Sequence, residues 1–240
     1  MRRLCMFAFV VGFLGGCAGG FNLPATHRPA SYTVHRGDTL YSIAWHYGLD
    51  YQDVARWNGI SSPYTIQPGE HISLYPHRRT SRPVHSGKTV TYAIAKSPQP
   101  APAHANKAAA PAAGDTTLQW QWPASGDALA TFGKNGLAGK GVVIVGKLGE
   151  PVTAAASGTV VYAGDALVGY GWLVIVKHND EWLSAYGHNQ RLLVREGQQV
   201  KSGEKIATMG VAPDGKPSLY FEIRRDGAPV NPLRFLPGKR

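Results

Sequence analysis

The stretch that decides the fold is GYGWLVIVKHNDEWLSAYGH, which runs from Gly169 to His188. Residues 172–176 form a continuous apolar run, the pattern of a strand that is buried on both faces. Residues 178–181 supply turn formers, because Asn and Asp tolerate left-handed backbone angles at low cost. The chain then returns over residues 182–186. The stretch therefore predicts a hairpin, with His188 just past its far end at the edge of a sheet.

Further strand-like runs fill the rest of the carboxyl-terminal half and are separated at short intervals by Gly and Pro. They lie at residues 141–145, 158–163, 173–177, 182–186, 205–209 and 218–224. This punctuation is typical of an all-β sandwich or of a barrel-like sheet. The sequence thus predicts an all-β domain over residues 118–240.

The amino terminus has the features of a secretory signal. A basic start, MRR, is followed by an apolar stretch, residues 4–14, which is too short to span a bilayer as a helix. Leu14-Gly15-Gly16-Cys17 resembles a lipobox; the alternative is a plain signal with a chance cysteine. We expect a signal peptide over residues 1–16 and a lipid anchor on Cys17. In lipoproteins of this type, an Asp after the cysteine is the usual signal for retention in the inner membrane. Here Ala18 follows Cys17, so the expected location is the periplasmic face of the outer membrane.

The charge of the chain is strongly positive, with 25 Lys and Arg against 15 Asp and Glu, a formal net charge of +10. In a secreted protein such a charge favours polyanionic cell wall or anionic lipid surfaces as partners. The sequence contains no nucleic-acid-binding motif, so we expect no nucleic acid among its partners.

Residues 31–76 alternate strand and helix signals. The pattern predicts a strand at 31–35, helices at about 40–47 and 51–57, and a closing strand at 71–75, which is a small α+β module. The segment resembles a LysM domain through Tyr32-Thr33-Val34, Gly37-Asp38-Thr39-Leu40, Trp57-Asn58-Gly59 and Gln67-Pro68-Gly69. The resemblance implies a strand-helix-helix-strand fold that binds glycan strands containing N-acetylglucosamine, such as peptidoglycan.

The LysM resemblance also implies where the glycan would bind. The groove of that family lies between the loop after the first strand and the loop before the second, which here are Gly37, Asp38, Thr39 and Leu40 facing Asn58, Gly59, Ile60 and Ser61. Some of these residues are also turn and cap formers, since Asp or Thr starts a helix well and Asn-Gly ends one. We expect both roles, with backbone groups left over for sugar amides.

Residues 77–117 lack any periodicity. Pro and Ala dominate, large apolar side chains are few, and basic residues are scattered between them. Such a composition cannot form a core, so we expect a flexible, semi-extended linker between the two domains.

The carboxyl-terminal domain resembles the LytM, or lysostaphin-like, zinc endopeptidases. The resemblance rests on the order of many short motifs, among them Gly149-Glu150-Pro151-Val152, Tyr186-Gly187-His188 and Leu219-Tyr220-Phe221-Glu222. Active members of that family carry H-x-x-x-D, H-x-H and a further histidine in a Y-x-H segment. Their zinc is bound by the His and Asp of the first motif and by the second His of H-x-H.

This chain departs from the zinc motifs. Gly139 and Val143 stand where the His and Asp of the first motif belong, and Ser218 and Tyr220 stand where H-x-H belongs. Of the family's histidines only His188 remains. Hydrolysis by zinc needs three protein ligands and an open position. We therefore expect no catalytic residues, no metal and no cofactor.

An alternative zinc site, built from other residues of the domain, is the remaining route to metal binding. It would combine His188 with His178, the other histidine of the domain, and with a carboxylate such as Glu222 or Asp165. We expect His178 instead to brace the turn of the hairpin, and His188 could equally cap a loop.

The groove of the lost zinc site is the expected partner-binding site. Val143 and Tyr220 would give it an apolar and aromatic floor, suited to a peptide or a helix. Its expected lining is Gly139, Val143, Tyr186, His188, Ser218, Tyr220 and Glu222.

This chain combines a lipobox-like run, a LysM-like module and a degenerate LytM-like domain. In this combination it resembles the NlpD class of murein hydrolase activators. This resemblance implies a non-catalytic protein that binds peptidoglycan and activates a periplasmic N-acetylmuramoyl-L-alanine amidase during cell separation. The alternatives are an active zinc-dependent peptidoglycan endopeptidase and a passive cell-wall tether.

Overall fold

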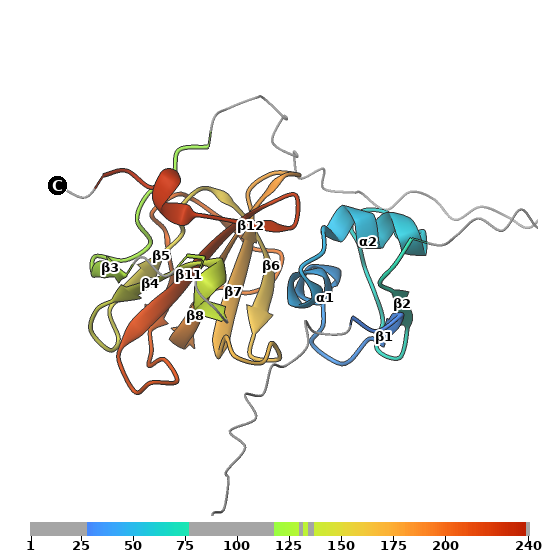
Figure 1. Ribbon diagram of the computed structural model, residues 1–240, viewed down its shortest axis with the longest axis horizontal. Helices are drawn as coiled ribbons and strands as arrows, with labels where there is room; N and C mark the ends of the chain where they lie inside the picture. Colours follow the sequence, from blue (N-terminus) through green and yellow to red (C-terminus); the bar gives the residue numbers. More distant parts are fainter. Residues whose placement is uncertain (1–27, 77–117, 130–131, 134–136, 239–240) are drawn as a thin grey trace, which may run out of the picture.

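The computed structural model describes residues 28–76, 118–129, 132–133 and 137–238 (Figure 1). The expected signal peptide, Cys17 and the linker at residues 77–117 lie outside the described residues. Within the described part of the chain, no helix has the length and apolar character needed to cross a membrane.

The amino-terminal module, residues 28–76, has the predicted strand-helix-helix-strand order. It consists of β1 (Ser31–Thr33), α1 (Leu40–Tyr47), α2 (Tyr51–Asn58) and β2 (His71–Ser73). The two strands pair antiparallel, with Tyr32 opposite Ile72. The predicted α+β module is therefore confirmed.

The two helices of the module begin and end at capping residues. Thr39 caps α1 by accepting a hydrogen bond from the backbone N of Ser42 at 3.0 Å, and the Ser42 hydroxyl accepts one from the backbone N of Thr39. Asp50 caps α2, because its side chain accepts hydrogen bonds from the backbone N of Gln52 and of Asp53. Gly48 and Gly59 end the helices in the left-handed conformation, which glycine adopts without steric penalty.

The carboxyl-terminal domain, residues 118–238, is built from antiparallel strands. Its elements are β3 (Asp127–Leu129), η1 (Leu137–Lys140), β4 (Val142–Val145), β5 (Pro151–Thr153), β6 (Gly158–Gly164), β7 (Trp172–Lys177), β8 (Trp182–Leu192), β9 (Gln199–Val200), β10 (Lys205–Met209), β11 (Ser218–Arg225), β12 (Ala228–Val230) and η2 (Pro232–Arg234). The main sheet has the order β3-β4-β11-β8-β7-β6-β9. The predicted all-β domain is confirmed.

The predicted hairpin forms the centre of this sheet. β7 pairs with β8, and the turn between them is closed by Asn179, whose side-chain oxygen accepts hydrogen bonds from the backbone N of Glu181 and of Trp182. However, β8 does not end before His188. It continues to Leu192 because its far end pairs with β10. The expectation that His188 lies past the hairpin is therefore wrong.

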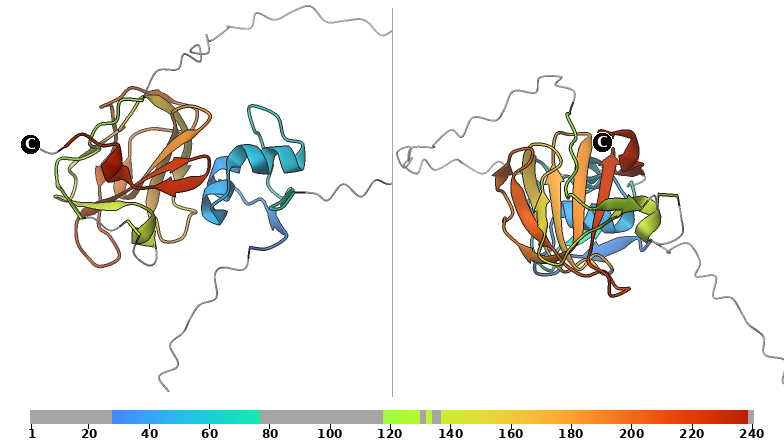
Figure 2. Two further views of the ribbon diagram at one scale, coloured as in Figure 1. Left: turned by 45° about the horizontal axis from the view of Figure 1, so that its top comes forward. Right: turned by 90° about the vertical axis from the view of Figure 1, so that its left-hand side faces the viewer.

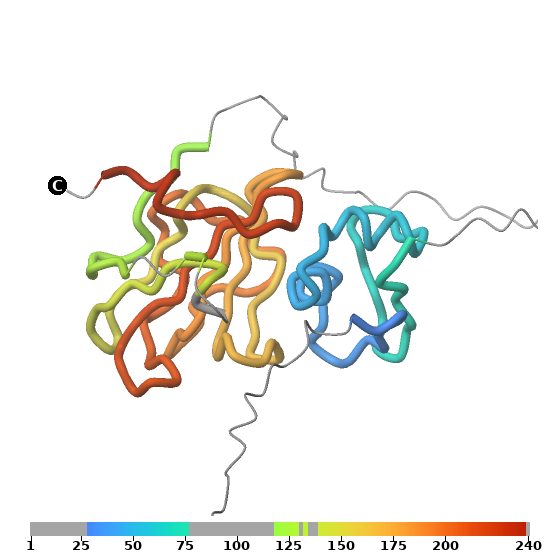
Figure 3. Tube along the Cα trace, viewed as in Figure 1, coloured from blue at the N-terminus to red at the C-terminus, as the bar shows by residue number. Residues whose placement is uncertain are grey.

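The two faces of the main sheet are both buried, against different partners. One face, which includes Phe221 and Ile223, packs into the core of the carboxyl-terminal domain. The other face carries Ile175, Ala185 and Tyr220, and these side chains form one continuous apolar cluster with residues of the amino-terminal module. All views place the module against this second face, with α1 beside β6 (Figures 1 and 2). The tube in Figure 3 shows the same contact between segments far apart in the sequence.

Candidate functional site

The second face of the sheet is where the sequence places the degenerate zinc site, and we call it the groove face. It is defined here by Val143, Ala185, Tyr220, Glu222 and Arg224. Tyr220 lies opposite Val143 on β4 and opposite Gly187 on β8, so the ladder brings two of the substituted ligand positions together. Glu222 pairs with Ala185, and the alternation of a strand places Tyr220, Glu222 and Arg224 on the same side.

The remaining predicted lining residues lie around this face. Gly139 is in η1, where its carbonyl accepts a hydrogen bond from the backbone N of Gly133 at 2.8 Å. Ser218 starts β11 opposite Val145 and is buried. Ser218 therefore lies on the same strand as Tyr220, and Gly139 lies in the short helix just before β4, the strand that pairs with Tyr220.

Tyr186 is the predicted lining residue that the structure places elsewhere. It is fully buried in the core of the carboxyl-terminal domain, on the opposite face of the sheet, where its hydroxyl accepts a hydrogen bond from the backbone N of Ala155 at 2.8 Å. It lies opposite Phe221, which also points into that core. The expectation that Tyr186 lines the groove is therefore wrong.

A backbone irregularity explains why Tyr186 and His188 separate although they are two residues apart. The pairing of β7 with β8 shifts register between Trp172 and Val174, and His188 has a positive φ of 59°. Such a bulge reverses the alternation of side chains along the strand. The ring of His188 accordingly lies 6.0 Å from that of Tyr220, and burial lowers its pKa.

A row of buried polar side chains crosses the groove face. The Tyr220 hydroxyl donates to Oε2 of Glu222 at 2.5 Å, and Nε of Arg224 donates to Oε1 of the same carboxylate at 2.6 Å. None of the three side chains is more than 1% exposed. Burial, reinforced by the charge of Glu222, raises the pKa of Tyr220 far above its ordinary value, so its hydroxyl remains a donor.

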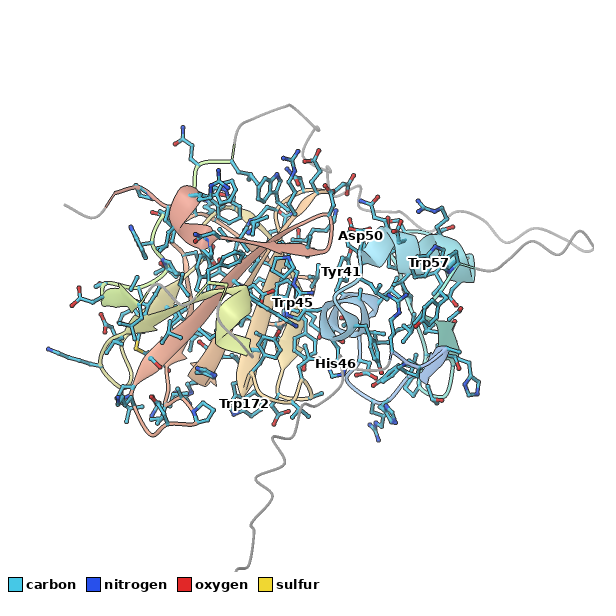
Figure 4. The ribbon with its side chains drawn as sticks, viewed as in Figure 1. Tyr41, Trp45, His46, Asp50, Trp57 and Trp172 are labelled. Atoms are coloured by element: carbon cyan, nitrogen blue, oxygen red, sulfur yellow. The ribbon has the colours of Figure 1, made fainter. Side chains whose placement is uncertain are left out.

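The amino-terminal module closes over this row through Trp45 of α1. Nη1 of Arg224 donates to the backbone carbonyl of Trp45 at 2.8 Å, and the guanidinium carbon lies 3.6 Å from the centre of the Trp45 ring. Figure 4 shows Tyr41, Trp45 and His46 on the side of the module that faces the sheet. The groove face is thus covered in this conformation by a helix of the same chain.

The rim of this junction contains further contacts between the two parts. The Gln52 side-chain amide donates to the backbone carbonyl of Asp180 at 2.9 Å, and the Tyr51 hydroxyl donates to the carboxylate of Asp180 at 3.4 Å. Gly227, in the turn after β11, approaches the backbone of Leu49 and Asp50 so closely that a Cβ atom would lie 2.4 Å from the Asp50 nitrogen.

The donor set of the groove face does not fit a catalytic zinc ion. Gly139 and Val143 have no side-chain donor atoms, and the Tyr220 hydroxyl is engaged with Glu222. A catalytic zinc ion needs three protein ligands. Across residues 28–76, 118–129, 132–133 and 137–238, no three His, Cys, Asp or Glu side chains converge in a way that could hold a metal.

His178 is committed to a hydrogen-bond network in the turn of the hairpin. Its Nδ1–H donates to the carbonyl of Ser157 and its Nε2 accepts from the Ser184 hydroxyl, both at 2.8 Å. The Ser184 hydroxyl is in turn hydrogen-bonded to that of Tyr186. His178 thus braces the start of β8 while His188 lies near its other end, and the two do not converge. The expectation that His178 braces the turn is confirmed.

The predicted glycan-binding residues of the module are all placed around its two loops. The Asp38 carboxylate accepts hydrogen bonds from the Tyr32 hydroxyl and the His35 backbone N, each at 2.8 Å. The Asn58 amide is fully used inside the module, since it bonds to the backbone of Val54 and Ser73. The predicted turn and cap roles are therefore confirmed, and the glycan role stays a prediction.

Most other residues of these loops can contact a glycan mainly through their backbone groups. The Leu40 side chain is fully buried in the module, so any contact of this residue with a sugar would be made by its backbone. Gly37 and Gly59 have no side chains. The backbone N–H of Ile60 donates a hydrogen bond to the backbone carbonyl of Ala55. Ser61 is exposed and accepts a hydrogen bond from the backbone N of Tyr64.

A cavity of about 560 Å³ adjoins the first of these loops. Asp38 and Thr39 line it from the module, together with residues 62–66, and Lys177 and Glu196 line it from the carboxyl-terminal domain. The predicted second loop, Asn58 to Ser61, ends just before this lining begins. The space beside the predicted glycan loop is therefore shared by both parts of the chain.

Sequence reasoning missed two residues that shape the site, Trp45 and Arg224. A signal for Arg224 was present: the run Tyr220, Glu222, Arg224 alternates with apolar residues in a strand that reads as buried, and charges in such strands are almost always paired. No local signal pointed to Trp45, because its contact with Arg224 joins positions 179 apart in the sequence.

Comparisons with known proteins match both parts of the chain. A model of peptidase family M23 matches residues 135–232, and a LysM domain model matches residues 32–74. The lipoprotein NlpD/LppB homolog of Pseudomonas aeruginosa is 48% identical over 86% of this chain and 76% of its own length. The murein hydrolase activator NlpD of Escherichia coli is 36% identical over 90% of this chain and 70% of its own. These matches confirm the predicted resemblances.

Among solved structures, the antimicrobial peptidase lysostaphin from Staphylococcus simulans is similar to this chain. It is 27% identical, with a TM-score of 0.44, over 48% of this chain and 51% of its own.

Proposed function

The chain belongs to the NlpD family of lipoproteins, and on that premise we propose that it is a non-catalytic murein hydrolase activator. It binds peptidoglycan through its amino-terminal module and activates a periplasmic N-acetylmuramoyl-L-alanine amidase during cell separation. One observation carries the non-catalytic part of this proposal: Gly139, Val143 and Tyr220 occupy the positions at which active LytM peptidases bind zinc.

The same premise supports a membrane anchor. Relatives of the chain are named lipoproteins, and the lipobox-like run ending at Cys17 supplies a candidate attachment site. We propose that Cys17 carries the lipid and that the chain faces the periplasm from the outer membrane. Several acyl chains on one residue would give lasting attachment.

The defining experiment adds the purified chain to N-acetylmuramoyl-L-alanine amidases of its own organism and follows the release of dye from labelled peptidoglycan. We expect release only when chain and amidase are both present, and no chelator-sensitive release by the chain alone. One tightly held zinc ion per chain, with cleavage of peptidoglycan cross-links, would instead identify an endopeptidase. Wall binding without any effect on an amidase would identify a passive tether.

Glycan binding by the module is tested at Asp38. Its carboxylate fixes the loop after β1 through Tyr32 and His35, and hydrogen bonds to a charged group contribute about 1.5–3 kcal/mol each. Asp38→Ala should therefore weaken pelleting of the chain with purified peptidoglycan by about tenfold or more, since 1.4 kcal/mol is tenfold.

The matched control for this experiment is Asp53→Ala. It removes the same charge from the surface of α2, where Asp53 pairs with Arg56. The control should pellet like the unaltered chain. Equal pelleting of both variants, with α1 and α2 intact by circular dichroism, would show that the loop after β1 does not hold the glycan.

A further inference from the structure

Arg224 makes an unusual set of contacts for a residue that is 1% exposed. It pairs with Glu222, donates to the Trp45 carbonyl at 2.8 Å, and stacks on the Trp45 ring at 3.6 Å. Removing a charge from water is expensive, and a buried ion pair is often no more stabilising than apolar side chains of similar volume. A contact whose role is only to hold the module in place could therefore be made with less desolvation by apolar residues.

The contacts of Arg224 suit the recognition of a helix end. Trp45 lies in the last turn of α1, where the backbone carbonyls carry a partial negative charge. Its carbonyl accepts from the backbone N of Gly48 at 3.2 Å and, having two lone pairs, also accepts from Arg224. The guanidinium plane has several donors in fixed directions and a flat face that stacks on aromatic rings. One cation thus binds a carbonyl of the last helical turn and the aromatic side chain of the same residue.

The position of Arg224 connects this chemistry to the proposed function. It lies on β11 on the same face as Tyr220 and Glu222, two of the residues expected to bind the partner. That face is occupied by α1, so an external helix and α1 cannot bind it together. Only release of the module would expose Tyr220, Glu222 and Arg224.

We propose that α1 closes the groove face at Tyr220, Glu222 and Arg224 as an internal substitute for a helix of the amidase, so that the chain is inactive until its amino-terminal module is released. The partner element is then a helix with an aromatic residue in its last turn and a carbonyl free to accept from Arg224. This inference rests on the proposed activator function and adds the residues, the chemistry of the partner and the reason that the chain would be inactive when closed.

The inference predicts opposite effects for two substitutions that break the same contact. Trp45→Ala removes the occupant and leaves the surface intact, so it should raise amidase activation. Arg224→Met combined with Glu222→Gln removes the guanidinium that would bind the partner's helix and leaves no buried charge unpaired. This double variant should therefore abolish activation. Aromatic and arginine contacts of this kind commonly change affinity by about thirtyfold when truncated. We expect changes of at least about tenfold in each direction.

Two measurements are made on each full-length variant: the opening of the junction, by the radius of gyration from X-ray scattering, and the affinity for the amidase in the absence of peptidoglycan. Arg225→Ala is the matched control for the arginine, because Arg225 is adjacent, exposed and paired with Glu181. Trp57→Ala is the control for the tryptophan, because Trp57 lies on α2, away from the junction (Figure 4). Neither control should change opening or affinity.

Each possible result has a clear meaning. Higher affinity for Trp45→Ala with loss for the double variant supports the inference. Higher affinity for both would show that Arg224 only holds the module, and an open Trp45→Ala chain with unchanged affinity would show that the amidase binds elsewhere; both overturn it. A Trp45→Ala chain that stays closed overturns it as well. Absence of binding to any amidase, by the unaltered chain and every variant, would instead overturn the proposed activator function itself.

Discussion

Replacing Arg224 by alanine is expected to lower the free energy of unfolding by about 3–5 kcal/mol, because it leaves the Glu222 carboxylate buried without its cation. Glu222 is 0% exposed, and after the substitution it keeps the hydrogen bond from the Tyr220 hydroxyl but loses the one from Arg224. Urea denaturation followed by circular dichroism measures the change. If the amino-terminal module is instead released and water reaches Glu222, the substitution increases the radius of gyration of the chain.

Two further variants separate the buried charge from the loss of a side chain. Arg225→Ala removes an exposed arginine from the next position and should change stability by less than about 1 kcal/mol. The double substitution Arg224→Met with Glu222→Gln should recover most of the loss, since it leaves no unpaired charge. An Arg224→Ala chain as stable and as closed as the unaltered one would show that the ion pair of Arg224 with Glu222 does not stabilise the folded chain.

Acid is expected to destabilise the carboxyl-terminal domain through His178. Burial lowers the pKa of His178 from its ordinary value of 6.5 to about 4. In the folded chain the ring is neutral, with Nε2 accepting from Ser184, and a proton on that nitrogen would oppose this hydrogen bond. Above pH 6.5 both folded and unfolded states hold a neutral ring. Between about pH 6.5 and 4 the unfolded state takes up a proton that the folded state does not, so stability falls as the pH falls.

The size of the effect follows from the pKa difference. One pKa unit corresponds to 1.36 kcal/mol, so the loss between pH 6.5 and 4 is at most about 3 kcal/mol. The His178 side chain is half-buried, so solvent screening reduces the effect, and we expect a loss of stability of about 1–3 kcal/mol. Denaturation of the unaltered chain and of His178→Gln at pH 7 and pH 4.5 measures it. His178→Gln should flatten the pH dependence, and an unchanged slope would assign the acid sensitivity to other groups, such as His188 with its lowered pKa.

The sequence was sufficient for much of the fold because the relevant signals are local. The apolar run at residues 172–176 and the Asn179 turn predicted the central hairpin, and Thr39 and the Asn58-Gly59 pair predicted the helix ends. These features depend on alternation and capping, which operate over a few residues.

The parts that could not be predicted depend on non-local geometry. The bulge that turns His188 and Tyr186 to opposite faces results from the register of three paired strands. The closed junction depends on Trp45 meeting Arg224, and neither position predicts the other. The sequence therefore indicated which zinc ligands are replaced, but not that a helix of the same chain covers their positions.

The contact between Trp45 and Arg224 has a quantitative consequence because both residues belong to one chain. A site and an occupant that are covalently connected meet at an effective concentration on the order of millimolar. A partner present at about one micromolar competes at a thousandfold disadvantage, which corresponds to about 4 kcal/mol. A partner that displaces α1 must bind that much more tightly than α1 does, or be brought to a comparable local concentration by binding the same stretch of cell wall.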